Sequence, residues 1–162
     1  MKKSIDDLPA FVIIDLSAQE RIVARPGSIE DAGFSYRGGK LAWTELIQDP
    51  RWENRSWAEL MVYDFKTDRK TRLTHGKRYF SPVISPAGDQ IAVIEERSDG
   101  SSNLQILDGA DGRQIRSMPE AVNDHFSYIC WSSRPDELFA ITTGNKGRKL
   151  VRIDLRERSQ EV

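Results

Sequence analysis

The amino-acid sequence predicts an all-β protein built from repeated antiparallel sheets. The first observation is an apolar, strand-like run that ends in aspartate and occurs four times along the 162 residues. The closing aspartates are 49, 44 and 46 residues apart, at Asp15, Asp64, Asp108 and Asp154. A period of ~40–50 residues is typical of a β-propeller, in which each repeat is one four-stranded blade.

A second pattern recurs in the same order. It consists of an apolar residue, a serine, a polar turn and an apolar strand, and the aligned serines are Ser35, Ser85 and Ser132. The turns contain the Gly, Pro and Asp that tight hairpins need. The strands that follow are almost continuously apolar, as expected of strands buried on both faces. Each blade therefore has the serine strand first, the apolar strand second, the aspartate strand third and a basic edge strand fourth.

This strand order places residues 1–162 in one propeller segment of about three and a half blades. Residues 11–25 supply the outer strands of a first blade, and complete blades follow over 32–74 and 79–118. The last blade, 126–162, is incomplete because only a short stub remains for its fourth strand. The segment 45–59 contains Pro50 and lacks a clear strand period, so we expect an inserted loop there.

The repeated strings resemble the TolB-like β-propeller repeat family. Residues 78–115 follow that family's repeat nearly position by position, with Ala87 where the family has aspartate in Ser-Pro-Asp-Gly. The corresponding turns at 36–39 and 133–136 depart further from the family pattern but keep turn residues. The resemblance covers the chain from about residue 10 and implies an all-β, partial propeller. It also implies a periplasmic or extracellular scaffold, or the propeller part of a peptidase.

Composition excludes several classes of function. The chain has 24 basic and 25 acidic residues, a net charge of -1, which argues against a nucleic-acid partner. A single cysteine excludes an intramolecular disulfide and a Cys-based zinc site. The first residues lack the apolar core of a signal peptide, and no run approaches the ~18 apolar residues of a membrane span.

No pattern in the sequence predicts catalysis, a metal or a cofactor. The two histidines, His75 and His125, lack metal-ligand spacing and fall in connections between blades. Cys130 lies inside a first strand, where we expect it to face a neighbouring blade and to be inert. The four closing aspartates are expected to accept backbone hydrogen bonds in the turns that follow them.

One edge of the segment is the candidate surface for a protein or peptide partner. In an antiparallel blade the loop between the second and third strands lies at the same edge as the connection to the next blade. Exposed tryptophan and arginine are enriched at interaction hot spots. The candidate residues at this edge are Trp52, Arg55, Trp57, His75, Tyr79 and His125. The alternative is that the tryptophans fold back onto the blade edge as a local cap.

The sequence thus predicts a non-catalytic protein-binding or scaffold module. The alternative function is a substrate-gating propeller of a larger peptidase whose catalytic domain lies outside this chain. Three and a half blades do not close a ring, so their apolar end faces need a cover. That cover is either the remaining blades of a propeller or a second copy, and a homodimer would complete a seven-bladed ring.

Overall fold

The computed structural model describes residues 9–29, 33–51, 56–120, 124–157 and 159–161, and every regular element within them is a β-strand. The strands form four antiparallel sheets, each a simple meander in chain order. The first sheet has two strands, β1 (Phe11–Ile14) and β2 (Glu20–Ala24). The second sheet contains β3 (Phe34–Arg37), β4 (Lys40–Gln48), β5 (Ser56–Asp64) and β6 (Arg69–Arg72).

The third and fourth sheets repeat the four-stranded plan of the second. The third contains β7 (Tyr79–Ile84), β8 (Gln90–Glu96), β9 (Ser102–Asp108) and β10 (Gln114–Pro119). The fourth contains β11 (Asp124–Trp131), β12 (Glu137–Gly144), β13 (Gly147–Asp154) and the short β14 (Ser159–Glu161). The predicted all-β fold of four-stranded antiparallel sheets is therefore confirmed.

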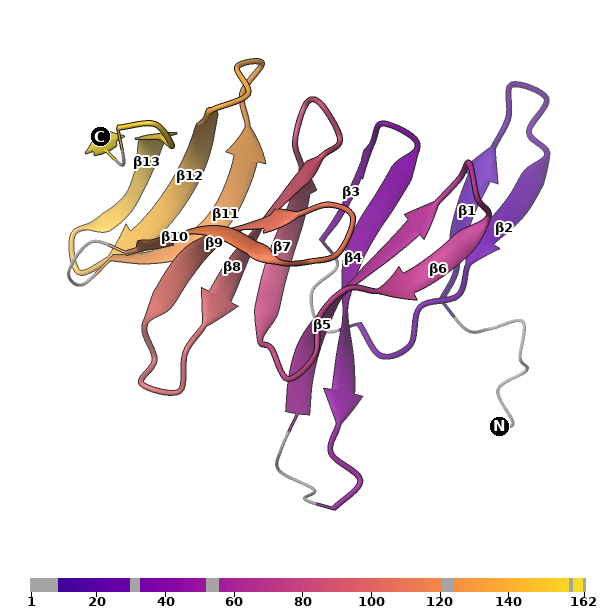
Figure 1. Ribbon diagram of the computed structural model, residues 1–162, viewed down its shortest axis with the longest axis horizontal. Coiled ribbons are helices and arrows are strands. Elements are labelled where there is room, and N and C mark those ends of the chain that lie inside the picture. Colours follow the sequence, from indigo (N-terminus) through magenta and orange to yellow (C-terminus); the bar gives the residue numbers. More distant parts are fainter. Residues whose placement is uncertain (1–8, 30–32, 52–55, 121–123, 158, 162) are drawn as a thin grey trace.

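The sheets stand side by side in sequence order, with the first sheet at one end of the row and the fourth at the other (Figure 1). Strand β7 contacts β3 of the preceding sheet and β11 of the following sheet. The first strand of each four-stranded sheet is therefore the one that meets its neighbours along the inner side of the row. The same arrangement places successive blades around the axis of a propeller.

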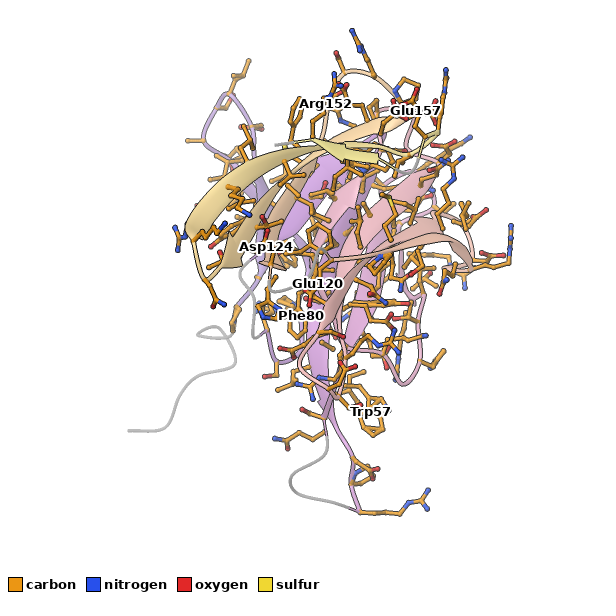
Figure 2. All side chains as sticks on the ribbon, turned by 90° about the vertical axis from the view of Figure 1, so that its left-hand side faces the viewer. Trp57, Phe80, Glu120, Asp124, Arg152 and Glu157 are labelled. Carbon is orange, nitrogen blue, oxygen red and sulfur yellow. The ribbon has the colours of Figure 1, made fainter. Side chains whose placement is uncertain are left out.

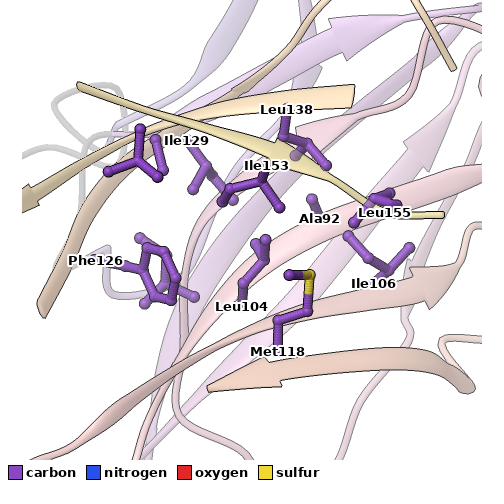
Figure 3. Packing of buried hydrophobic residues seen from close by; sticks show 12 residues of the cluster. Ala92, Leu104, Ile106, Met118, Phe126, Ile129, Leu138, Ile153 and Leu155 are labelled. Atoms are coloured by element: carbon purple, nitrogen blue, oxygen red, sulfur yellow. The ribbon is translucent and has the colours of Figure 1, made fainter. Parts of the chain in front are cut away.

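Apolar side chains between neighbouring sheets hold the row together. Three buried clusters lie in turn between the first and second, second and third, and third and fourth sheets. In the last of these, Leu104 and Ile106 of β9 meet Leu138 and Ile153 of the fourth sheet (Figure 3). Each such side chain, 0 % exposed, contributes ~1.5–3 kcal/mol relative to an exposed position. Each cluster draws on two sheets, so a sheet is stabilised by the presence of its neighbour.

The four closing aspartates hold the turns after the third strands, as the sequence predicts. Asp15, Asp64, Asp108 and Asp154 each accept the backbone N–H of the residue two positions later, at 2.7–2.8 Å. Hydrogen bonds to a carboxylate favour its charged form. The N–H groups of Thr67 and Lys66 accordingly hold the pKa of Asp64 below its usual value, and the N–H groups of Glu157 and Arg156 do the same for Asp154.

Two expectations about local structure are wrong. Residues 45–48 and 56–59 do not belong to an inserted loop but to strands, because β4 and β5 pair continuously from Lys40↔Asp64 to Gln48↔Ser56. Glu45 and Glu59 are charged residues that interrupt the apolar pattern expected of a buried strand, yet both side chains are buried in the structure. Cys130 does not face a neighbouring blade but is exposed, because β11 turns Ile129 into the core and no further sheet of the described strands packs on its opposite face.

Candidate interaction surfaces

The loop edge is the side of the row where the β4–β5 hairpin and the β6–β7 connection come together. The backbone N–H of Ala58 donates to the carbonyl of Lys77 at 2.8 Å. Beside this bond, a Cβ placed on Gly76 would lie 3.5 Å from the indole nitrogen of Trp57. The predicted proximity of the second-to-third loop and the connection to the next sheet is thus present. In Figure 1 the β8–β9 loop points to the same side.

The buried side chain of Glu59 on β5 holds the β6–β7 connection by hydrogen bonds. Its carboxylate, 0 % exposed, accepts hydrogen bonds from Thr74 Oγ1 at 2.7 Å, Lys77 N at 3.1 Å and Arg72 Nη2 at 3.2 Å. Thr74 Oγ1 in turn accepts the N–H of Leu60 at 2.9 Å. A buried carboxylate is tolerated where a cation and several donors surround it. This cluster therefore holds the loop edge in one conformation.

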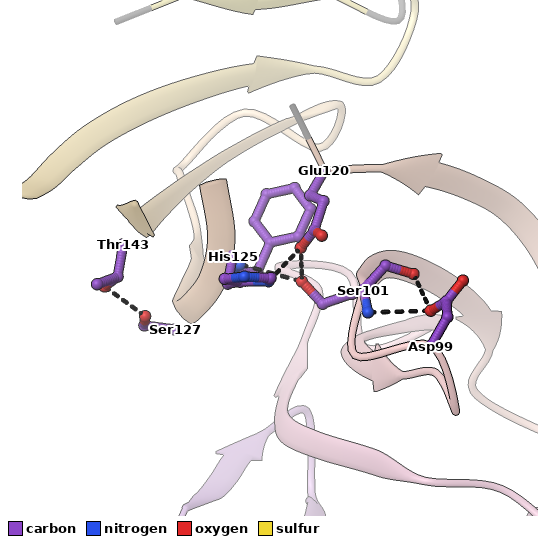
Figure 4. A network of polar contacts seen from close by, with 8 residues as sticks. Asp99, Ser101, Glu120, His125, Ser127 and Thr143 are labelled. Carbon is purple, nitrogen blue, oxygen red and sulfur yellow. Dashed lines mark hydrogen bonds and ion pairs between the residues drawn. The ribbon is translucent and has the colours of Figure 1, made fainter. Parts of the chain in front are cut away.

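Ser102 and Glu120 belong to a comparable hydrogen-bonded cluster in the third sheet (Figure 4). Ser102 Oγ donates a hydrogen bond to Glu120. It also accepts a hydrogen bond from the N–H of Phe126 at 3.1 Å, and this second bond links β9 to the start of β11. His125 Nδ1 lies 3.1 Å from the same Glu120 oxygen. Because the carboxylate stands between the hydroxyl and the imidazole, the imidazole is not placed to take a proton from the serine. The arrangement joins strands and resembles no nucleophile–base pair.

The predicted partner-binding residues fall into three groups. His75 and His125 are exposed and Trp57 is half-buried. Tyr79 is only 1 % exposed and packs in the cluster between the second and third sheets, so it cannot contact a partner. Burial raises the pKa of its hydroxyl, and the nearby Glu95 and Glu59 raise it further. Trp52 and Arg55 lie outside the described residues.

The accessible predicted residues do not form one patch. Trp57 lines a hollow of about 210 Å³ together with Pro50 and Arg72 at the loop end of the β4–β5 hairpin. His125 borders a separate hollow of about 410 Å³ between the third and fourth sheets. Figure 2 shows Trp57 well away from Glu120, the partner of His125. The loop edge therefore carries two small sites rather than a single groove.

Exposed apolar side chains gather toward the two ends of the row. Among the described residues, ten large hydrophobic side chains are exposed. Nine of them belong to the first sheet and its turn, to β3 or to the fourth sheet, and the tenth is Ile115. The nine are Val12, Ile13, Ile14, Leu16, Ile22, Phe34, Tyr36, Tyr128 and Leu150. The number of blades in the sequence predicts that the two end faces are uncovered. Which residues lie on those faces depends on which set of alternate side chains in each strand points outward.

An apolar cleft of about 790 Å³ opens beside the first sheet, where the other sheets have their first two strands. Phe11 and Ile13 of β1 line one wall, and Phe34 and Tyr36 of β3 line the other. Among the described strands, β1 pairs with β2 alone. One edge of β1 and the cleft next to it thus mark the position of two inner strands.

Metal and membrane sites receive no support from the described part of the chain. No three His, Cys, Asp or Glu side chains gather there so as to hold a metal ion. Nor does that part contain a helix long and apolar enough to cross a membrane.

Comparison with solved structures assigns the architecture. TolB from Acinetobacter baumannii superposes with a TM-score of 0.71 at 16% identity, over 98% of this chain and 38% of TolB. The tricorn protease gives 0.67 at 13% identity, over 93% of this chain and 20% of the protease. The fold is a partial β-propeller. An oligogalacturonate lyase in complex with manganese also matches this propeller segment, with a TM-score of 0.66 and 17% identity over 94% of the chain and 46% of the lyase.

The propeller segment spans well under two thirds of each of these proteins. No protein-family model matches its sequence, and no curated protein matches it either. Identities of 13–17% show a shared fold and leave the activity open, since unrelated functions use one fold.

Proposed function

We propose that this propeller segment is a non-catalytic protein-binding or scaffold module. The observation that carries the proposal is the gathering of exposed apolar side chains at the two ends of the row of sheets. Contiguous exposed apolar surface on a globular protein marks an interaction site. The polar clusters around Glu59 and Glu120 fit this role because they join strands and orient no nucleophile.

The loop edge supplies a second surface for a different polypeptide. His75 is exposed, and the adjacent Gly76 lies against half-buried Trp57. The hydrogen bond from the Lys77 N–H to Glu59 holds this stretch of backbone in place. Aromatic side chains beside a small hollow bind a partner with little loss of side-chain entropy. A partner that docks here would leave both ends of the row free.

A tagged chain expressed in its source cells tests partner binding at the loop edge by co-purification. We expect a partner polypeptide to be retained by the wild type and lost with Trp57→Ala and His75→Ala combined. The matched control is Lys66→Ala in the turn after β5, at the opposite edge of the second sheet. Equal recovery with all three proteins, or recovery of no other polypeptide, would overturn partner binding at the loop edge.

The second candidate function is a substrate-gating propeller of a peptidase, and the match to the tricorn protease favours it. The same purification separates the two candidates. A co-purified chain that hydrolyses peptides, with an activity that changes when the propeller segment is removed, would favour gating. A co-purified chain without such activity would favour the scaffold.

A further inference from the structure

The hollow of about 410 Å³ between the third and fourth sheets is bordered by two β-bulges. The pairing of β7 with β8 shifts at Ser81, and the pairing of β11 with β12 shifts at Ser127. Both serines line the hollow. A bulge redirects the side chains of its strand, and bulges are over-represented next to functional sites. The hollow therefore has a bulge on each of two neighbouring first strands.

Ser81 adopts a strained backbone conformation inside β7. Its φ is +49°, in the left-handed region that residues other than glycine rarely occupy. Among the described residues, the other non-glycine positions with positive φ are Ala18 and Asp68, and both lie in connections between strands. Strain within a regular element persists only where the surroundings impose it, and such positions cluster at ligand-binding sites. The strain at Ser81 thus points to the hollow as a binding site.

Glu120 fixes the tautomer of His125, which lines the same hollow. The ionised carboxylate of Glu120 only accepts hydrogen bonds, and one of its oxygens meets both the Ser102 hydroxyl and His125 Nδ1 (Figure 4). Nδ1 therefore carries the proton, and Nε2 of the neutral imidazole is an acceptor. Because Ser102 donates its own proton to Glu120, its oxygen is an acceptor too.

The remaining walls of the hollow are anionic and apolar. Glu96 lines it and pairs through Oε2 with Arg78 at 3.0 Å, with both side chains about half exposed. An ion pair this exposed is weak, so a ligand can compete with Arg78 for the carboxylate. Phe80, Ile94 and Phe126 supply the apolar surface. The hollow therefore combines hydrogen-bond acceptors and negative charge with aromatic rings.

We propose that this hollow binds a lysine side chain of a partner polypeptide. The ammonium group has three donors and no acceptor, so it matches Glu96 and His125 Nε2. The aliphatic stem packs on the apolar wall, and the face of Phe80 attracts the cation. An anionic group would instead meet two carboxylates of like charge. This inference rests on the proposed protein-binding function and assigns a partner chemistry to the second site of the loop edge.

A capped amino acid tests the inference on the intact chain. The probe is Nα-acetyl-lysine N-methylamide, and its control is the norleucine analogue, which has an aliphatic chain without the ammonium group. The chain has two histidines, so NMR of the imidazole C–H groups reports on the hollow through His125 and on another site through His75. At about pH 8, where ordinary imidazoles are neutral, the lysine probe should shift the His125 signals saturably and leave His75 unchanged. We expect a millimolar Kd, and binding of the norleucine analogue about tenfold weaker.

Two substitutions should change the affinity for the lysine probe in opposite directions. Glu96→Gln removes a carboxylate from the hollow and should weaken binding about fivefold. Arg78→Gln removes the competing cation and should strengthen binding by about the same factor. The matched control is Glu20→Gln, at an exposed carboxylate of the first sheet, which should leave the affinity unchanged. A gain of affinity does not arise from misfolding, so Arg78→Gln separates recognition from stability.

Three outcomes would overturn the inference. His125 signals that move with neither probe exclude binding, and equal affinities for the two probes exclude recognition of the ammonium group. An affinity unchanged by both Glu96→Gln and Arg78→Gln places the lysine outside this hollow. Partner retention through Trp57 and His75 is measured separately, so it can persist when lysine binding fails, and lysine binding can persist when partner retention fails.

Discussion

Glu59 places a charge inside the second sheet, where three donors surround it. Glu45 is the neighbouring case, since it accepts a hydrogen bond from Trp43 Nε1 at 2.8 Å and pairs with Lys70 at 2.6 Å. The cations that neutralise both carboxylates lie on β6. At the residue scale, therefore, charged side chains secure the edge strand to the buried strands of its sheet.

Replacing Glu59 should lower stability far more than replacing an exposed glutamate. Glu59→Ala leaves Arg72, Thr74 and the Lys77 N–H without their acceptor, so we expect a loss of ~3–5 kcal/mol in the free energy of unfolding. The control is Glu96→Ala, which removes an ion pair with Arg78 whose side chains are 54% and 48% exposed, and should cost less than ~1 kcal/mol. Urea unfolding measures both, and equal losses would contradict this account of Glu59.

Acid should weaken the turns that Asp64 and Asp154 hold. Their folded-state pKa lies below the ordinary value of 3.8, so the stabilisation is complete above that value and is lost as the pH falls through the folded-state pKa. We expect Tm to fall more steeply below about pH 4 for the wild type than for Asp64→Asn with Asp154→Asn. Asparagine still accepts the backbone N–H but does not titrate, so identical pH profiles would contradict the assignment.

Turn residues were the most predictable part of this molecule, and buried charges the least. The role of the closing aspartates follows from a local rule: the side chain of an aspartate before a turn accepts the backbone N–H of the residue two positions later. Glu59 and Tyr79 depend on partners from other strands, and their burial has no signature in their own neighbourhood. The expectation that Cys130 faces a neighbouring blade fails because alternation along a strand does not say which of its two faces meets a neighbour.

At the scale of elements, the turn after β9 brings the third sheet against the second. Gly112 has φ of +74°, and a Cβ on it would lie 2.5 Å from the carbonyl oxygen of Leu73. That distance is shorter than any carbon–oxygen contact in a packed interior, and the obstacle is backbone. A glycine at this position is therefore required by both conformation and space.

Gly112→Ala should destabilise the protein by more than the conformational penalty alone. The control is Gly100→Ala, where φ is +81° but no atom lies within 4 Å of the new Cβ. We expect Gly100→Ala to cost ~1 kcal/mol and Gly112→Ala at least twice that, since the second and third sheets must also separate. Thermal unfolding of the two variants tests the difference, and equal Tm values would argue against a close approach of the two sheets.

At the scale of the whole molecule, the row of four sheets is a segment of a ring. The repeat period predicts this architecture, because each sheet covers one apolar face of its neighbour and repeats in steps of one blade. The sequence does not reveal what covers the two end faces, since that depends on residues from another chain or another segment. The apolar cleft beside β1 belongs to the same open end.

Amide hydrogen exchange tests most directly the claim that this chain is a row of four sheets, open at both ends. Conditions that keep the protein monomeric are used, so that only the chain's own sheets protect its amides. We predict the slowest exchange in β4, β5, β8 and β9, which are paired on both edges and buried on both faces. Exchange in β1 and β2 should be the fastest among the paired strands, because their outer face is exposed. Protection in β1 and β2 equal to that of β8 and β9 would contradict the account.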